Sequence, residues 1–250
     1  YNMIKFNKHK ILKLIVDKEE FLPSNLLGIW INPFFIVRKA LIKGVLEISK
    51  HLNRGKLLDI GCGKKPYEKM FDVDEYIGID IEISGHDHSS SNIDIFYDGK
   101  VIPFANETFD CAFCSEVFEH VFNLDELLNE INRVLKPGGK LGFTCPFVWD
   151  LHEKPYDFAR YTPFAIEHLL KKHGFKLIKL QKSTGYIETV MQMFSAYVYQ
   201  YLLPRNKYQK LLLSIFFVAP INIIGVIFGA VLPKNGNFYH NNIVIAEKNI

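Results

Sequence analysis

The chain has 250 residues, of which 48% are apolar, so it can bury the core of one large domain or of a domain with an insertion. The net charge is only +3 and no long run of Lys and Arg marks a nucleic-acid-binding surface, so we expect no nucleic-acid partner. Four cysteines are too few for a disulfide scaffold and suit a reducing, cytoplasmic compartment. The basic stretch 5–20 is too charged for a signal peptide.

Helices and apolar strands alternate along the chain. The first predicted element is an amphipathic helix over 32–52, which we assign to an N-terminal helical segment, 1–55. Two further helices are predicted over 124–136, before Pro137-Gly138-Gly139, and over 162–175, with Thr162 as its N-cap. Short apolar runs predict seven strands, at 56–60, 76–81, 92–98, 109–115, 140–147, 176–181 and 242–248. This alternation predicts an α/β domain, 56–250, with helices on both faces of a largely parallel sheet.

A glycine-rich turn, "GCG", directly follows the first predicted strand. Gly61 and Gly63 lie where the backbone must approach a ligand closely, at the carboxyl end of a strand. Asp80 ends the second strand about 20 residues later, the distance at which an acid meets ribose hydroxyls. A dinucleotide-binding loop would carry a third glycine where Pro66 stands, so the pattern disfavours NAD.

Several motifs resemble, in order and spacing, those of the class I S-adenosylmethionine (SAM)-dependent methyltransferases of the type 11-like kind. "LLDIGCG" resembles the first motif, "YIGIDI" the second and "DGKVIPFANETFD" the adenine-side loop, while "SEVFEHV" and "INRVLKPGGKLGFTCP" resemble the segments around the fourth and fifth strands. The resemblance covers about residues 30–181 and the closing strand, and Lys65 departs from it where many members carry a third glycine. It implies a Rossmann-like sheet of seven strands whose last strand is antiparallel, and the sequence adds a helical insertion between strands six and seven.

The resemblance also implies the cofactor, SAM, and the residues that hold it. Asp59 and the amides of the glycine turn would face the methionine portion, and Asp80 would hold the ribose diol. A strand-end role for Asp80 and a loop-capping role for Asp98 are the alternatives. The implied cofactor-binding residues are Asp59, Gly61, Cys62, Gly63, Asp80, Ile81, Asp98, Gly99, Ser115 and Glu116.

The segment 146–164, "PFVWDLHEKPYDFARYTPF", leaves the fifth strand at the ligand edge and resembles the "H-(E/D)-x-P-x-D-(F/Y)-x-R-(Y/F)-T" loop of bacterial methyltransferases related to polysaccharide and glycolipid assembly. A hydroxyl acceptor must lose a proton, and a nearby His or carboxylate can take it. The candidate catalytic residues are His152, His120 and Asp157, and the candidate substrate-binding residues are Trp149, Tyr156, Arg160 and Tyr161. The alternatives are a helix-start role for His120, an Asp157–Arg160 ion pair and a core position for Tyr161.

No metal site is predicted. Cys111 and Cys114 form a C-x-x-C pair, but residues three apart in a strand point to opposite faces and cannot clamp one ion. The nine histidines show no ligand spacing.

The insertion, 186–235, contains an amphipathic stretch over 186–203 and a stretch over 211–232 with no charged residue, long enough to span a membrane. Because both ends return to one sheet, only a hairpin could span, and its tip, "PRNKYQK", is basic, which disfavours translocation. The remaining alternatives are packing on the sheet, a roof over the active site, a homodimer, or peripheral membrane contact through 186–232.

These patterns predict an enzyme that transfers a methyl group from SAM to a small-molecule acceptor, with a hydroxyl of a sugar, glycolipid or polysaccharide precursor as the first candidate. A quinone or lipid methyltransferase is the second, because "EVFEHV" also resembles enzymes of ubiquinone biosynthesis. A non-catalytic partner protein that retains the fold is the third, although the intact glycine turn speaks against it. The expected location is the cytoplasm, free or at the membrane surface.

Overall fold

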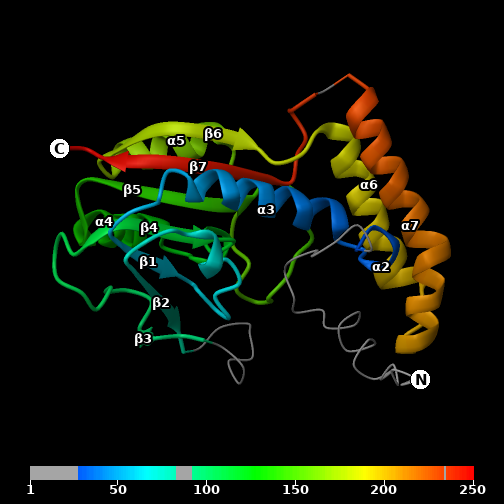
Figure 1. Cartoon of the computed structure of the whole chain (residues 1–250), viewed down its shortest axis with the longest axis horizontal. Helices are drawn as coiled ribbons and strands as arrows, with labels where there is room; N and C mark the ends of the chain where they lie inside the picture. Colours follow the sequence, from blue (N-terminus) through cyan, green and yellow to red (C-terminus); the bar gives the residue numbers. More distant parts are fainter. Residues whose placement is uncertain (1–27, 83–91, 234) are drawn as a thin grey trace, which may run out of the picture.

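The computed structural model describes residues 28–82, 92–233 and 235–250. Seven strands form one sheet in the order β3-β2-β1-β4-β5-β7-β6 (Figure 1). The strands are β1 (Lys56–Ile60), β2 (Glu75–Ile81), β3 (Ile95–Tyr97), β4 (Phe109–Ser115), β5 (Leu135–Pro146), β6 (Phe175–Lys182) and β7 (Asn241–Lys248). β7 runs antiparallel to β5 and β6, whereas the other pairs are parallel. The predicted fold is therefore confirmed.

The helices lie close to the predicted positions. They are α2 (Gly28–Ile31), α3 (Phe35–Ser49), α4 (Leu124–Val134), α5 (Pro163–Lys172), α6 (Tyr186–Tyr197) and α7 (Lys207–Val231), with 3₁₀ turns at Glu68–Met70 and Phe118–His120 and a π-helical turn at Val198–Leu202. Thr162 caps α5 as expected, because its hydroxyl accepts a hydrogen bond from the Ala165 amide at 3.2 Å. β5 begins earlier than predicted, since the chain turns extended directly after α4.

Two apolar cores cover the two faces of the sheet. On one face α4 contributes Ile131 to a core that includes Cys114 of β4. On the other face α3 contributes Ile48 to a core that includes Cys111. The two cysteines therefore face opposite sides of the sheet, as the strand period requires. Because α3 shares a core with the strands, it packs as part of the same body as residues 56–250.

The insertion forms a helical hairpin, α6 and α7, at the end of the sheet where β6 ends (Figure 1). The two helices pack on each other and on α2 and α3. Asn222, inside α7, donates hydrogen bonds to the carbonyls of Ile29 at 3.0 Å and Asn32 at 2.9 Å. A side chain on Gly225 would lie 2.7 Å from Ile36, so this glycine permits the close approach of α7 to α3. One side of the hairpin is thus anchored by packing and buried polar contacts.

The other side of the hairpin is apolar and exposed. From Tyr208 to Val231, α7 is the one helix in the described part of the chain that is long and apolar enough to cross a membrane, and 33% of its most apolar window is buried. A single helix of this kind is weak evidence for a membrane span. The outer face of the hairpin consists of large apolar side chains that are each at least 39% exposed: Val190, Phe194, Tyr197, Tyr201, Leu202, Tyr208, Leu212, Ile215, Phe216, Phe217, Ile224, Ile227, Phe228 and Val231.

Candidate active site

The glycine turn lies at the carboxyl end of β1 and is fastened to β2. Gly61 and Gly63 both have positive φ, +69° and +49°, which glycine adopts without strain. Asp80 accepts a hydrogen bond from the Gly63 amide at 2.9 Å, so the acid that ends β2 lies against the turn as predicted. A side chain on Gly61 would clash with Val117, whereas one on Gly63 would meet no atom within 4 Å. The turn therefore leaves open space beside an exposed backbone, which fits a ligand that approaches the chain closely.

Lys65 replaces the third glycine of many related loops and has a structural role. Its φ is 51°, and its side chain is 4% exposed. The ammonium group forms an ion pair with Asp94, and the Asp94 carboxylate also accepts a hydrogen bond from the Gly78 amide at 2.7 Å. Asp94 was not among the residues predicted from sequence. This pair ties the glycine turn across β2 to the segment before β3.

Asp59, at the end of β1, is buried. Its carboxylate accepts a hydrogen bond from the Tyr76 hydroxyl at 2.6 Å. Burial raises the pKa of Asp59 to about 7, against the opposing effects of the Tyr76 hydrogen bond and of Lys65. A cationic group bound near this carboxylate would favour its ionised form.

The adenine-side residues are brought together at the ends of β2 and β3. A side chain on Gly99, whose φ is +76°, would lie 3.2 Å from Ile81, so these two residues are neighbours. Asp98 accepts hydrogen bonds from the amides of Lys100 at 2.8 Å and Val101 at 2.9 Å, which lower the pKa of its exposed carboxylate. The loop-capping alternative for Asp98 is therefore realised, and contact of Asp98 with adenine stays a prediction.

The end of β4 holds Ser115 and Glu116 against β5 and β7. The Ser115 hydroxyl lies 3.0 Å from that of Thr144. The Glu116 carboxylate accepts hydrogen bonds from Thr144 at 2.7 Å and from the Asn241 side chain at 2.6 Å. Glu116 keeps part of its surface exposed, yet desolvation of its carboxylate raises its pKa to about 7. The start of β7 therefore also borders this part of the site, which the sequence motifs did not indicate.

Two predicted catalytic residues, His120 and His152, lie face to edge with ring centroids 4.7 Å apart. His120 comes from the 3₁₀ turn after β4 and His152 from the loop after β5. The Nδ1 atom of His120 lies 2.6 Å from the Tyr156 carbonyl, so Nδ1 carries the proton and Nε2 keeps its lone pair. Burial lowers the pKa of His120, which favours the neutral imidazole.

The third catalytic candidate, Asp157, forms an ion pair. Both of its oxygens accept hydrogen bonds from Arg160, one of them at 2.9 Å, and the Arg160 guanidinium holds the pKa of Asp157 well below its usual range. Asp157 also accepts the His152 amide at 3.0 Å and lies 3.3 Å from His152 Nδ1. The ion-pair alternative is thus realised, and the carboxylate positions His152 and is a poor proton acceptor.

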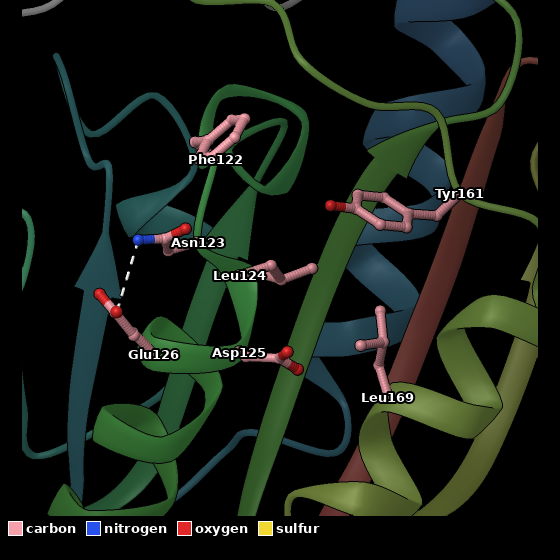
Figure 2. Close-up of a pocket in the computed structure, with 7 residues that line it drawn as sticks. All are labelled: Phe122, Asn123, Leu124, Asp125, Glu126, Tyr161 and Leu169. Atoms are coloured by element: carbon pink, nitrogen blue, oxygen red, sulfur yellow. Dashed lines mark hydrogen bonds between the residues drawn. The ribbon is translucent and has the colours of Figure 1, made fainter.

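The other substrate candidates lie in different surroundings. Trp149 packs edge-on against Phe34 and His240, with centroids 5.8 and 5.6 Å apart, and Tyr156 is 40% exposed. Tyr161 packs on the core and reaches toward Leu124 in a pocket of about 370 Å³ at the start of α4 (Figure 2). The pocket contains none of the glycine-turn residues and neither histidine. It is lined by Phe122, Asn123, Leu124, Asp125, Glu126, Tyr161 and Leu169.

Glu119 belongs to this part of the site, although of the pair Glu119-His120 only His120 was predicted to be catalytic. Its side chain is fully buried, and neither carboxylate oxygen has a hydrogen-bond partner. Desolvation by burial, together with repulsion from the nearby Glu116 carboxylate, raises the pKa of Glu119 well above its usual range. The available signal is its position directly before His120, within the "SEVFEHV" segment at the exit of the fourth strand.

The sheet order, the antiparallel last strand and the glycine turn after β1 together define the class I methyltransferase fold. The sequence also matches the profile of a family described as a methyltransferase domain over residues 36–180, more than half of the chain. The chain belongs to this methyltransferase family. Its cofactor is SAM, and the protein is an enzyme, which disfavours the non-catalytic alternative.

Three known proteins illustrate the extent of the similarity. An uncharacterized protein of Methanocaldococcus jannaschii is 28% identical over 60% of this chain and 77% of its own length. The ubiquinone/menaquinone biosynthesis C-methyltransferase of Klebsiella pneumoniae is 33% identical over 38% of this chain, and only 36% of the enzyme's length is matched. The crystal structure of a SAM-dependent methyltransferase from Archaeoglobus fulgidus shares the fold, with a TM-score of 0.51 and 18% identity over 85% of this chain and 93% of the other.

Proposed function

We propose that the enzyme methylates a hydroxyl group of a sugar or glycolipid precursor. The observation that carries this proposal is the His120–His152 pair, formed by the turn after β4 and the loop after β5, near the strand end where the cofactor's sulfonium is expected. Bound SAM supplies an electrophilic methyl group: the acceptor oxygen bonds to the methyl carbon while the carbon–sulfur bond breaks and its electron pair stays on sulfur.

The histidine pair supplies what a hydroxyl acceptor needs. The Nε2 atom of His120 has no hydrogen-bond partner, and the Nδ1 atom of His152 lies near two acceptors, the Asp150 carbonyl at 3.2 Å and the Asp157 carboxylate at 3.3 Å. On each imidazole, Nε2 is therefore the nitrogen left for interaction with the hydroxyl oxygen or its proton. Trp149 and the exposed Tyr156 add aromatic faces of the kind that stack on sugar rings.

The outer face of the hairpin supports an acceptor carried on a lipid. The hairpin lies at the end of the sheet toward which the parallel strands run (Figure 1), and His120 and His152 follow the carboxyl ends of two of these strands, β4 and β5. Arg205, exposed at the hairpin tip, adds positive charge that attracts anionic lipid headgroups. We propose that the enzyme acts in the cytoplasm at the membrane surface, in peripheral contact through 186–232. A second copy of the chain is the competing occupant of this face.

A quinone or other lipid acceptor is the second candidate function. It is favoured by the sequence similarity to the ubiquinone/menaquinone enzyme and by the same apolar face. In that case the methyl group would form a bond to a ring carbon instead of an oxygen.

Methyl transfer from labelled SAM to a matched acceptor panel tests the function. The panel contains a polyprenyl-linked sugar, the free sugar and a quinol. We expect label in an alkali-stable ether on the sugar, and a His152→Ala variant with kcat at least tenfold lower and an unchanged Kd for SAM. Label found only on a ring carbon of the quinol would establish the second candidate. An equal loss of turnover and SAM affinity in His152→Ala would indicate a folding role for His152.

Flotation with phosphatidylglycerol vesicles tests the membrane contact. We expect the wild-type protein to float, a Phe216→Asp/Phe228→Asp variant to remain at the bottom, and a Phe164→Asp control to float, because the 82% exposed Phe164 lies on α5 away from the hairpin. A wild-type protein that does not float but halves its mass when Phe216 and Phe228 are replaced would show a dimer instead.

A further inference from the structure

We propose that Glu119, His120 and His152 bind a divalent transition-metal cation that activates the acceptor hydroxyl, an inference that rests on the proposed function. One ligand atom from each residue lies within 4.8 Å of the other two, the only such group of three in the part of the chain that the structure describes. The sequence predicted no metal, because Cys111 and Cys114 point to opposite faces of a strand and the nine histidines show no ligand spacing. The geometry revises that expectation.

The orphaned atoms of this cluster point to a missing positive ligand. Both oxygens of Glu119 and the Nε2 atom of His120 are buried and have no hydrogen-bond partner, and the Glu119 side chain is 0% exposed. A buried carboxylate without donors is costly, since its ionised form loses its hydration. A cation held between these atoms would stabilise the ionised carboxylate of Glu119 and would also be coordinated by the Nε2 lone pair of His120.

The outer contacts of both imidazoles are those of metal ligands. A metal-bound histidine donates its other ring N–H to a carbonyl or carboxylate, which fixes the ring and leaves the second nitrogen for the metal. His120 Nδ1 meets the Tyr156 carbonyl at 2.6 Å, and His152 Nδ1 meets the Asp157 carboxylate at 3.3 Å. The metal site would also explain the role of the Asp157–Arg160 ion pair, which keeps the Asp157 carboxylate ionised and oriented toward His152.

The distances between the ligand atoms would suit a small ion after the three side chains move slightly closer together. Ligands about 2.1 Å from a tetrahedral ion lie about 3.4 Å from one another. His120 Nε2 is already 3.7 Å from Glu119 Oε1, and the carboxylate of Glu153 lies 3.6 Å from the same nitrogen. Two imidazole nitrogens and one carboxylate favour a first-row cation such as Zn²⁺, Mn²⁺ or Fe²⁺ and leave open positions for an acceptor oxygen.

The cation would change how the acceptor hydroxyl is activated. As a Lewis acid it binds the oxygen and lowers the pKa of the hydroxyl, whose proton leaves to solvent water while the oxygen keeps the electron pair. The two imidazoles then act as ligands and need not take the proton. The oxygen attacks the methyl carbon as described above, and the cation is unchanged at the end.

Titration of the full-length, chelator-treated protein with Co²⁺ provides the test, because bound Co²⁺ reports its ligands by visible absorption. We expect one equivalent bound, with affinity at least tenfold lower in Glu119→Gln and His152→Ala and unchanged in His168→Ala, a control on the exposed face of α5. SAM calorimetry on each variant shows that the fold is intact. Equal Co²⁺ affinity in Glu119→Gln and His168→Ala would overturn the site, and so would absence of binding by Co²⁺, Zn²⁺ and Mn²⁺.

The methyl-transfer assay separates this inference from the proposed function. We expect chelation to reduce methylation of the sugar hydroxyl at least tenfold and Zn²⁺ or Mn²⁺ to restore it, with SAM affinity unchanged. Full hydroxyl methylation by metal-free protein would refute the metal site and leave the proposed function standing. Tight Co²⁺ binding at Glu119, with no hydroxyl methylated under any condition, would refute the proposed function and leave a metal site of another purpose.

Discussion

The two halves of the sheet's carboxyl edge differ in how their polar groups are satisfied. Around β1 and β2 each carboxylate has its donors: Asp59 has Tyr76, and Asp80 has the Gly63 amide. Around β4, β5 and β7 lie all the buried side-chain atoms without partners that the described residues contain: both oxygens of Glu119, Nε2 of His120 and of His240, Nε of Arg160 and Oδ1 of Asn241. The half around β1 and β2, predicted to bind the cofactor, is therefore preformed by the protein itself, whereas the half around β4, β5 and β7, proposed to bind the acceptor, holds buried polar atoms that the protein leaves without partners.

The largest expected effect in the preformed half is the pH dependence of stability caused by Asp59. Its pKa is about 7 in the folded protein and near 3.8 in the unfolded chain, so between these values only the folded state holds the proton and the free energy of unfolding falls as pH rises. The loss amounts to at most about 4 kcal/mol and is complete above pH 7. Denaturant unfolding of the wild type and of Asp59→Asn from pH 4 to 8 measures it. Parallel curves for the two proteins would show that Asp59 is not desolvated.

Removal of Asp80 should disable the cofactor half without affecting the acceptor half. Asp80→Ala loses the predicted contact with the ribose hydroxyls, and the Gly63 amide loses its acceptor. Because hydrogen bonds to a charged group are worth about 1.5–3 kcal/mol each, we expect SAM affinity to fall roughly 100-fold. Calorimetry with SAM measures the loss, with Asp72→Ala, an exposed residue before β2, as the control. Unchanged affinity in Asp80→Ala would remove the ribose assignment.

The two glycines of the turn should respond differently to the same substitution. Gly61→Ala places a methyl group against Val117 at positive φ, and we expect about 2 kcal/mol of lost stability. Gly63→Ala meets no protein atom and should cost about 1 kcal/mol from φ alone, but its methyl group enters the open space and should weaken SAM binding about tenfold. Thermal unfolding and calorimetry on both variants separate the effects. Equal SAM affinity in the wild type and Gly63→Ala would place the cofactor elsewhere.

The smallest effect is expected from the ion pair of the acceptor half. Asp157→Asn keeps a group that can accept the His152 amide but loses its charge, so His152 is held less firmly. We expect kcat to fall about tenfold, or about 1.4 kcal/mol in transition-state free energy, with unchanged Kd for SAM. A change in SAM affinity as large as the change in kcat would mean that this loop also supports the cofactor half.

The same contrast explains which features could be predicted from sequence. The glycine turn and Asp80 were predictable because strand ends and turn residues are local signals that a fixed topology brings together. The pairing of His120 with His152 was not, since it requires the loop after β5 to fold back until the Phe158 amide reaches the Glu119 carbonyl at 2.8 Å. Such contacts depend on the packing of segments far apart in sequence.

The position in which the hairpin packs could not be predicted from sequence either. The composition of 211–232 suits a membrane, a dimer interface or a buried helix alike. The side of α7 that packs on the domain is the side that carries Asn222, because its side-chain amide donates hydrogen bonds to two carbonyls at the start of the described chain. A single polar residue in an apolar helix indicates a partner but does not identify it.

Calorimetric titration of the purified, full-length protein with SAM and with its demethylated product tests the account most directly. We predict saturable binding of both at one site per chain. Absence of heat with either ligand, from protein shown to be folded by circular dichroism, would contradict the assignment of the glycine turn as the cofactor cradle.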